Sequence, residues 1–174
     1  MSWYEVVDSK EALLQGDFLS ECPVVRPPCP VPVEIPSEVQ VEIVTYNVVV
    51  MSQSCDLIER KLDLVLVCPV WPLEDFGTRE PFFAGAEGKE ALRRGNVTGY
   101  HLLNRCDVQG FRTDYSVVDF RTVYGVPFDS LVDLAARRGP RLRLCPPYRE
   151  HLSQAFARFF MRVGLPADIP PFKK

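Results

Sequence analysis

A run of five small polar or ionisable residues follows one of the most apolar stretches of the chain. It comprises Ser52, Gln53, Ser54, Cys55 and Asp56. The preceding residues 48–51 are all apolar, which is typical of a buried strand. A buried strand that ends in such side chains delivers them to one rim of a sheet, where rigid structure positions functional groups. A polar turn is the other interpretation, because Ser and Asp at strand ends satisfy their own backbone. We predict a site, because a turn does not need Gln, Ser, Cys and Asp together.

Cysteine chemistry is one activity that this run could support. Cys55 is its strong nucleophile, and it would need an adjacent base to form the thiolate. His101, in a predicted strand over residues 99–103, is the candidate general acid or base. The alternative for His101 is a half-buried, hydrogen-bonded strand histidine. With Asp56 or Asp119 as the carboxylate, these residues would form the site of a cysteine-dependent enzyme.

Metal binding is a further reading of the same residue types. Cys22, Cys29, Cys55 and His101 all carry atoms that bind zinc, but six residues separate the first two cysteines, which is wider than the spacing of zinc knuckles. Scattered core cysteines are the more common finding. We therefore predict no metal and no cofactor.

The composition indicates one folded domain spanning residues 1–174. Hydrophobic residues make up 47% of the chain and charged residues 25%, which is ordinary for a globular protein. The net charge of −3 provides no global attraction for nucleic acid, so any such binding needs a local patch. We find no signal peptide, no membrane span and no CxxC motif among the six cysteines, and these features predict a cytoplasmic protein with reduced thiols.

The hydrophobic patterning predicts a mainly β protein with helices, of the α+β class. Strands are expected at residues 39–51, 62–70, 97–103 and 115–126. Helices are expected at residues 9–15, 127–138 and 148–163, the last of them amphipathic with six apolar residues in one stripe. The proline-rich residues 22–36 fit an irregular loop or an edge strand, and residues 71–96 fit an insertion or lid with a helix at 88–94.

The order of these motifs resembles that of the MazF/PemK-like toxins. Gly16-Asp17-Phe18 resembles the Gly-Asp-Ile start of that family, and residues 48–52 followed by 64–69 resemble its paired strands. Residues 117–126, which lead into Leu131, resemble its late strand, and an amphipathic helix ends both. The resemblance implies a small SH3-like β-barrel, and many members cut single-stranded RNA, usually as dimers under the control of an antitoxin.

The chain departs from the family at one position that matters for catalysis. The family commonly has an Arg-Pro pair just before the first buried strand, and here residues 44–47 contain no arginine. Ser52 matches the position of the family's catalytic hydroxyl. The missing arginine favours a module that binds RNA or a protein partner without cutting it.

Three functions therefore stay open at the level of sequence. The first is a non-catalytic barrel module in a toxin–antitoxin or defence-related system, with RNA or a protein as partner and homodimerisation open. The second is an endoribonuclease, and the third is the cysteine-dependent enzyme. For the ligand we expect contacts from five residues, with Asp17 and the polar run converging on His101. These five are Asp17, Gln53, Ser54, Arg105 and Arg121.

Overall fold

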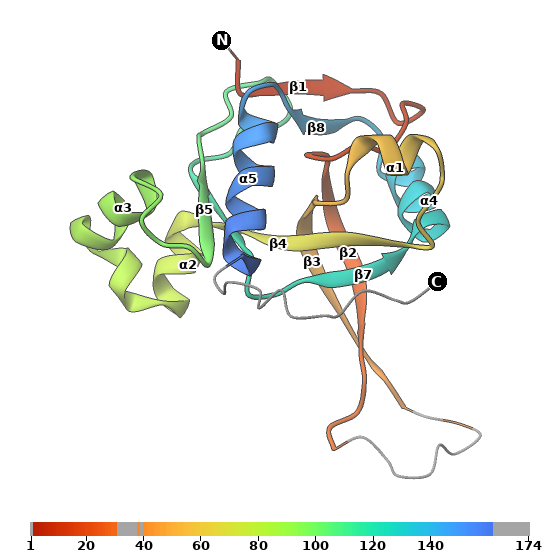
Figure 1. The fold of residues 1–174 in the computed structure, drawn as a ribbon, viewed down its shortest axis with the longest axis horizontal. Helices are drawn as coiled ribbons and strands as arrows, with labels where there is room; N and C mark the ends of the chain where they lie inside the picture. The colour runs from red at the N-terminus through yellow and green to blue at the C-terminus, as the bar shows by residue number, and fades with distance from the viewer. Residues whose placement is uncertain (1, 31–37, 39, 162–174) are drawn as a thin grey trace, which may run out of the picture.

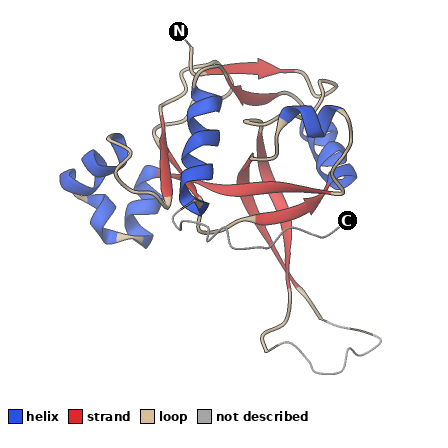
Figure 2. Ribbon diagram, viewed as in Figure 1, coloured by secondary structure: helices blue, strands red, loops and turns tan. Residues whose placement is uncertain are grey.

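The computed structural model describes residues 2–30, 38 and 40–161. In this part of the chain the strands are β1 (Tyr4–Val7), β2 (Phe18–Arg26), β3 (Glu42–Val50), β4 (Leu64–Pro72), β5 (Tyr100–Leu103), β6 (Ser116–Asp119), β7 (Tyr124–Pro127) and β8 (Arg141–Leu144). The helices are α1 (Ser54–Ile58), α2 (Leu73–Arg79), the 3₁₀ helix η1 (Pro81–Ala84), α3 (Ala86–Arg93), α4 (Phe128–Arg138) and α5 (Tyr148–Phe160). The predicted α+β class is confirmed (Figure 2).

The main sheet is antiparallel and open. Its strand order is β2-β3-β4-β6-β5, and β7 pairs with the first half of β4. Because β2 and β5 stand at opposite ends of this order, the sheet does not close on itself within the described residues, and the prediction of a closed SH3-like barrel is wrong. Strands β1 and β8 form a separate two-stranded sheet. The β2–β3 ribbon extends away from the body, whereas α5 lies across its front (Figure 1).

Alternation along β3 and β4 divides the core into two layers. Val48, Val50 and Val67 belong to one cluster with α4, whereas Val49 and Cys68 belong to a second cluster with β8 and α5. Successive strand side chains point to opposite faces, so these two clusters lie on the two faces of the sheet. A third, smaller cluster lies beneath α2, η1 and α3, which form the lobe beside β5 in Figure 1.

Several predicted elements agree with the structure. Strands β3, β4 and β5, together with helices α3 and α4, fall within a few residues of the predicted ranges, and β3 becomes buried on both faces at its end as expected. The proline-rich segment begins as the second half of β2, an edge strand, which is where a strand tolerates Pro23. Its later residues 31–36 lie outside the described residues.

Two predicted elements are wrong as stated. Residues 9–15 form turns and loop rather than a helix, because the side chains of Arg141 and Arg143 take the carbonyls of Glu11 and Ala12. Residues 115–126 form two strands instead of one, because the Asp119 carboxylate accepts the N–H of Arg121 and the hydroxyl of Thr122 in a turn.

The terminal helix packs against the second cluster through part of its predicted apolar stripe, which includes Leu152, Ala155, Phe156 and Phe159. Leu152 is fully buried and Phe156 packs against the same cluster, but Phe160 is 60% exposed. The apolar stripe therefore contacts the body through fewer residues than predicted. The last residues of the predicted helix, 162 and 163, lie outside the described residues.

Candidate nucleic-acid interface

The polar run after β3 forms a tight connection to α1. The Ser52 side chain is only 7% exposed, and its hydroxyl accepts the Leu66 N–H at 2.9 Å. The Ser54 hydroxyl accepts the Gln15 N–H at 3.2 Å. Gln53, at the N-cap position of α1, is exposed. The two serines thus satisfy backbone donors from other segments, which is the behaviour expected of a polar turn.

Cys55 and Asp56 lie at the start of α1. Cys55 is exposed, and its Sγ lies 3.8 Å from Asp56 Oδ1 and 4.0 Å from Gln53 Oε1. Asp56 is half-buried. The two described contacts of the thiol are therefore with an amide oxygen and a carboxylate oxygen, and neither is the histidine base that was predicted.

Asp17 sits at the centre of a buried charge cluster. Its side chain is 0% exposed, and Oδ2 accepts Arg141 Nε at 2.7 Å, Arg143 Nη2 at 2.9 Å and the Leu14 N–H at 3.1 Å. Oδ1 accepts Arg143 Nε. Both carboxylate oxygens are thus engaged by residues of the fold. Gly16, with a φ of +85°, brings Asp17 into this position beside Val50, and a side chain there would be strained.

His101 lies elsewhere in the molecule. Its ring stacks on Phe120, with 6.2 Å between ring centroids. Burial and, to a smaller extent, the charge of His151 on α5 together lower the pKa of His101 to about 4, so the imidazole is neutral near pH 7. Figure 1 places β5 and α1 on opposite sides of the body. The structure therefore brings Asp17 close to the polar run but does not bring His101 to Cys55.

The cysteines and histidines do not gather. Cys22, Cys68 and Cys106 are buried and Cys29 is exposed, all as free thiols. Among the described residues no group of three or more His, Cys, Asp or Glu side chains is placed to hold a metal ion. Likewise, no helix in the described part of the chain is long and apolar enough to cross a membrane.

The predicted phosphate contacts, Arg105 and Arg121, both lie over tyrosine rings. The Arg121 guanidinium is 4.4 Å from the Tyr100 ring centroid, and that of Arg105 is 5.3 Å from the Tyr115 ring centroid. Five such arginine–aromatic pairs occur in the described residues. The other three pairs involve the rings of Tyr46, Trp71 and Phe128.

Three aromatic side chains from three neighbouring strands meet on one face of the main sheet. The ring centroids of Tyr46 (β3) and Trp71 (β4) are 5.8 Å apart, and Tyr46 stacks on Tyr124 (β7) at 5.5 Å. All three side chains are half-buried. We call these three residues the aromatic platform. Half-exposed rings held by a sheet are surfaces on which the bases of a single strand stack.

Arginines surround the aromatic platform. Arg79 lies over Trp71 at 4.0 Å, and Arg26 lies over Tyr46 at 5.8 Å. Arg121 continues this surface past Asp119, since it pairs with Asp119 at 3.6 Å and with Glu80 at 2.6 Å. We call Arg26, Arg79 and Arg121 the flanking arginines. Each has one face that can stack and donors that can reach a phosphate.

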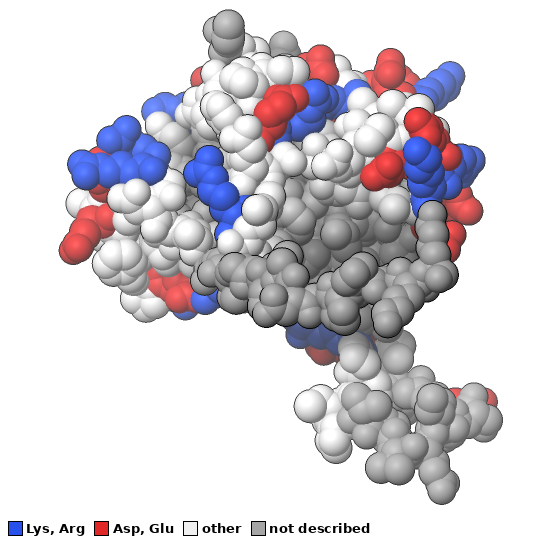
Figure 3. Space-filling view, viewed as in Figure 1, with Lys and Arg blue, Asp and Glu red and all other residues white. Residues whose placement is uncertain are grey.

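The charge of this interface is balanced. Glu42 lies 3.6 Å from Arg26, and Glu80 and Asp119 pair with Arg121. Figure 3 shows the same mixture at the scale of the molecule, because basic and acidic side chains are interspersed over that view with no large area of one sign. Binding at the aromatic platform would therefore depend more on stacking than on long-range attraction.

Sequence reasoning identified Arg121 but missed the aromatic platform. Tyr46 and Tyr124 fall within predicted strands, and Trp71 directly follows one. The sequence therefore indicated that all three aromatic residues lie in strands or next to one. What was missing is the pairing of β4 with both β3 and β7, which places the three rings together.

Comparisons with other proteins add no relative to this picture. No protein-family model matches the chain, and no curated protein is significantly similar to it.

Proposed function

We propose that this protein is a non-catalytic module that binds single-stranded RNA on the aromatic platform. The observation that carries this proposal is the group of three rings from β3, β4 and β7, with Arg79 over Trp71 and with Arg26 donating a hydrogen bond to the Tyr46 hydroxyl. Arg121 lies over the further ring of Tyr100. Each base stacked on such a ring contributes about 1–3 kcal/mol with little sequence preference. Single-stranded RNA, whose bases are free to stack, is the ligand that such a surface suits.

The proposal that the module is non-catalytic is supported by the hydrogen bonds and the positions of the candidate catalytic groups. The Ser52 hydroxyl accepts a backbone N–H, the Asp17 carboxylate is saturated by two arginines, and His101 stands apart from both. The resemblance to MazF/PemK-like toxins supports the same ligand class, because many members of that family act on single-stranded RNA. A role in a toxin–antitoxin or defence-related system is part of this proposal.

The direct test is fluorescence anisotropy with a labelled single-stranded RNA of about 12 nucleotides, within the range of known single-strand sites. Trp71→Ala should weaken binding by about tenfold or more, since a stacked base contributes about 1–3 kcal/mol. Phe82→Ala is the matched control, because Phe82 is 55% exposed and lies on η1, outside the platform. Near-UV circular dichroism verifies that both variants stay folded.

A second pair of variants separates stacking arginines from charge alone. Arg79→Gln with Arg121→Gln removes two flanking arginines, whereas Arg137→Gln with Arg158→Gln removes the same charge from α4 and α5. The first pair should lose binding and the second should keep it. Equal affinities for the two double variants, or no binding by the wild type at high micromolar protein, would overturn the proposal. Cleavage of the same RNA by the wild type but not by Ser52→Ala would establish the endoribonuclease instead.

A further inference from the structure

A separate cavity of about 680 Å³ lies beside the main sheet. Asn47, Val70 and Pro72, which alternate along β3 and β4 with Tyr46 and Trp71, line one part of it. Leu19 and Val48, from the cluster against which Tyr46 and Tyr124 pack, line another part, but no residue of the aromatic platform lines the cavity. Its volume falls within the range of small-molecule sites. The cavity is thus a candidate site independent of RNA binding.

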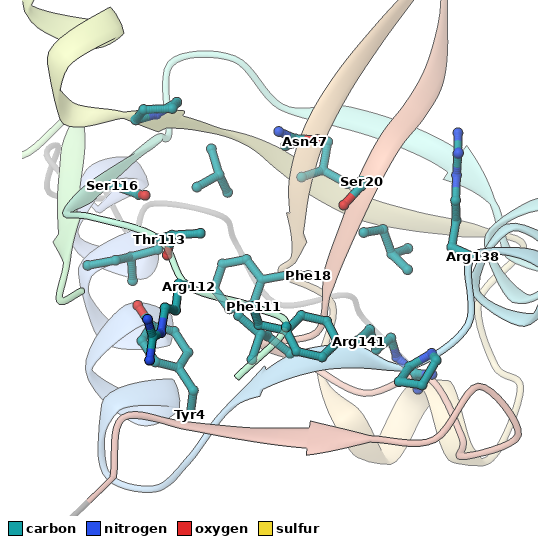
Figure 4. Close-up of a pocket in the computed structure, with 18 of the residues that line it drawn as sticks. Tyr4, Phe18, Ser20, Asn47, Phe111, Arg112, Thr113, Ser116, Arg138 and Arg141 are labelled. Atoms are coloured by element: carbon teal, nitrogen blue, oxygen red, sulfur yellow. The ribbon is translucent and has the colours of Figure 1, made fainter. Parts of the chain in front are cut away.

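The middle of the cavity is aromatic. Figure 4 shows Phe18 and Phe111 side by side in its centre, with Tyr4 below them. The Tyr4 hydroxyl donates to the Asn104 carbonyl at 2.6 Å, so its polar end is already satisfied. A flat apolar ligand would contact these rings, and the burial of its apolar surface would favour binding.

Polar groups from the β2 bulge lie along the opposite wall. The register between β2 and β3 shifts between Leu19 and Cys22, and Asn47 Oδ1 accepts the Glu21 N–H at 3.1 Å there. Figure 4 shows Asn47 and Ser20 together on this wall. Bulges that re-aim side chains recur beside functional sites.

The arginines at the two ends of the cavity differ in whether they form ion pairs. Arg138 pairs with Glu21 at 2.7 Å, and Arg141 pairs with Asp17, so both are compensated within the fold. Arg112, at the end shown beside Thr113 in Figure 4, makes no ion pair with any described residue. The carboxylate nearest to it in sequence, Asp114, also lines the cavity and accepts the Tyr115 N–H at 2.7 Å.

From this arrangement we infer that the cavity binds a small aromatic anion. Its apolar body lies against Phe18 and Phe111, and its anionic group meets Arg112. The buried cluster of Arg141, Arg143 and Asp17 at the other end carries two positive charges for one negative charge, which disfavours a cationic ligand there.

A pair of dyes tests this inference on the intact protein. The probe is 8-anilinonaphthalene-1-sulfonate, an aromatic anion, and its partner is N-phenyl-1-naphthylamine, the same apolar body without the sulfonate. Fluorescence titration should give one saturable site that prefers the sulfonate. Arg112→Gln should weaken sulfonate binding about tenfold, the scale of a hydrogen bond to a charged group, and leave the neutral dye unchanged. Asp114→Asn should strengthen sulfonate binding.

The controls distinguish the cavity from other dye sites. Arg105→Gln removes the same charge from a neighbouring position that does not line the cavity, and it should change neither dye. A cooperative thermal transition in the presence of dye excludes binding to loosened protein. Equal affinity for the two dyes, several sites per chain, or indifference of sulfonate binding to Arg112→Gln would overturn the inference. RNA binding does not enter any of these measurements.

Discussion

At the scale of single residues, Asp17 shows how a polar residue in a suggestive motif can be structural. The sequence gives Gly16-Asp17-Phe18 the look of a ligand-binding motif, yet the carboxylate accepts hydrogen bonds from two arginines more than 120 positions away in the chain. Removing one member of a buried charge cluster leaves its partners uncompensated. The same cluster explains why Arg141 and Arg143 are buried at all.

Asp17→Asn should therefore lower the free energy of unfolding by about 3–5 kcal/mol, because it leaves two buried guanidinium groups without their negatively charged partner. Urea denaturation monitored by circular dichroism measures this change. The matched control is Asp129→Asn, whose exposed pair with Arg60 at 2.7 Å should contribute less than about 1 kcal/mol. Similar midpoints for the two variants would mean that the cluster does not stabilise the fold.

His101 makes a prediction about pH. The unfolded histidine takes up a proton near pH 6.5, whereas burial lowers the pKa in the folded protein to about 4. Between these values the unfolded state binds more protons, so stability should fall as the pH drops from 6.5 to 4, by about 1–3 kcal/mol.

The comparison of wild type with His101→Gln isolates this contribution. Urea denaturation across that pH window should give a flatter stability profile for His101→Gln, while His151→Gln should flatten it only slightly, because it removes the smaller of the two causes that lower the pKa of His101. Parallel profiles for wild type and His101→Gln would show that folding does not shift the pKa of the imidazole.

At the scale of elements, the local spacing of hydrophobic residues predicts a strand or helix correctly where that spacing alone determines which side chains are buried. The alternation before Val48 and the continuous apolar run after it predict β3, and the apolar period of residues 148–160 predicts α5. Strand β8 reads Arg-Leu-Arg-Leu, a pattern that predicts exposed arginines, but Asp17 and the carbonyls of residues 8–12 accept their hydrogen bonds and allow them to be buried. The supposed helix at residues 9–15 fails for the same reason.

The residues of the candidate site likewise differ in whether local sequence predicts their positions. The rim position of residues 52–56 follows from the end of β3, and it was predictable because it is local. The separation of His101 from Cys55 depends on strand order, and the aromatic platform depends on the pairing of β4 with both β3 and β7. Strand order and strand pairing both involve residues far apart in the chain, so a short stretch of sequence could show neither.

At the scale of the whole molecule, one sheet carries two different surfaces. The aromatic platform and the 680 Å³ cavity share no lining residue, although β3 and β4 contribute side chains to both. The net charge of −3 and the mixture of charges over the surface give RNA no long-range attraction. Affinity for RNA must then come from contacts made within the platform itself.

The salt dependence of RNA binding tests that conclusion. Three flanking arginines can meet at most three phosphates, and each contact with a single strand contributes about 0.7 to the slope of log affinity against log salt. The slope for the wild type should therefore be no steeper than about −2, and Arg79→Gln should make it shallower by about 0.7. Anisotropy titrations over a series of potassium chloride concentrations measure both values. A slope near −4 would require about six phosphate contacts, which Arg26, Arg79 and Arg121 cannot supply, and would locate the RNA on another surface.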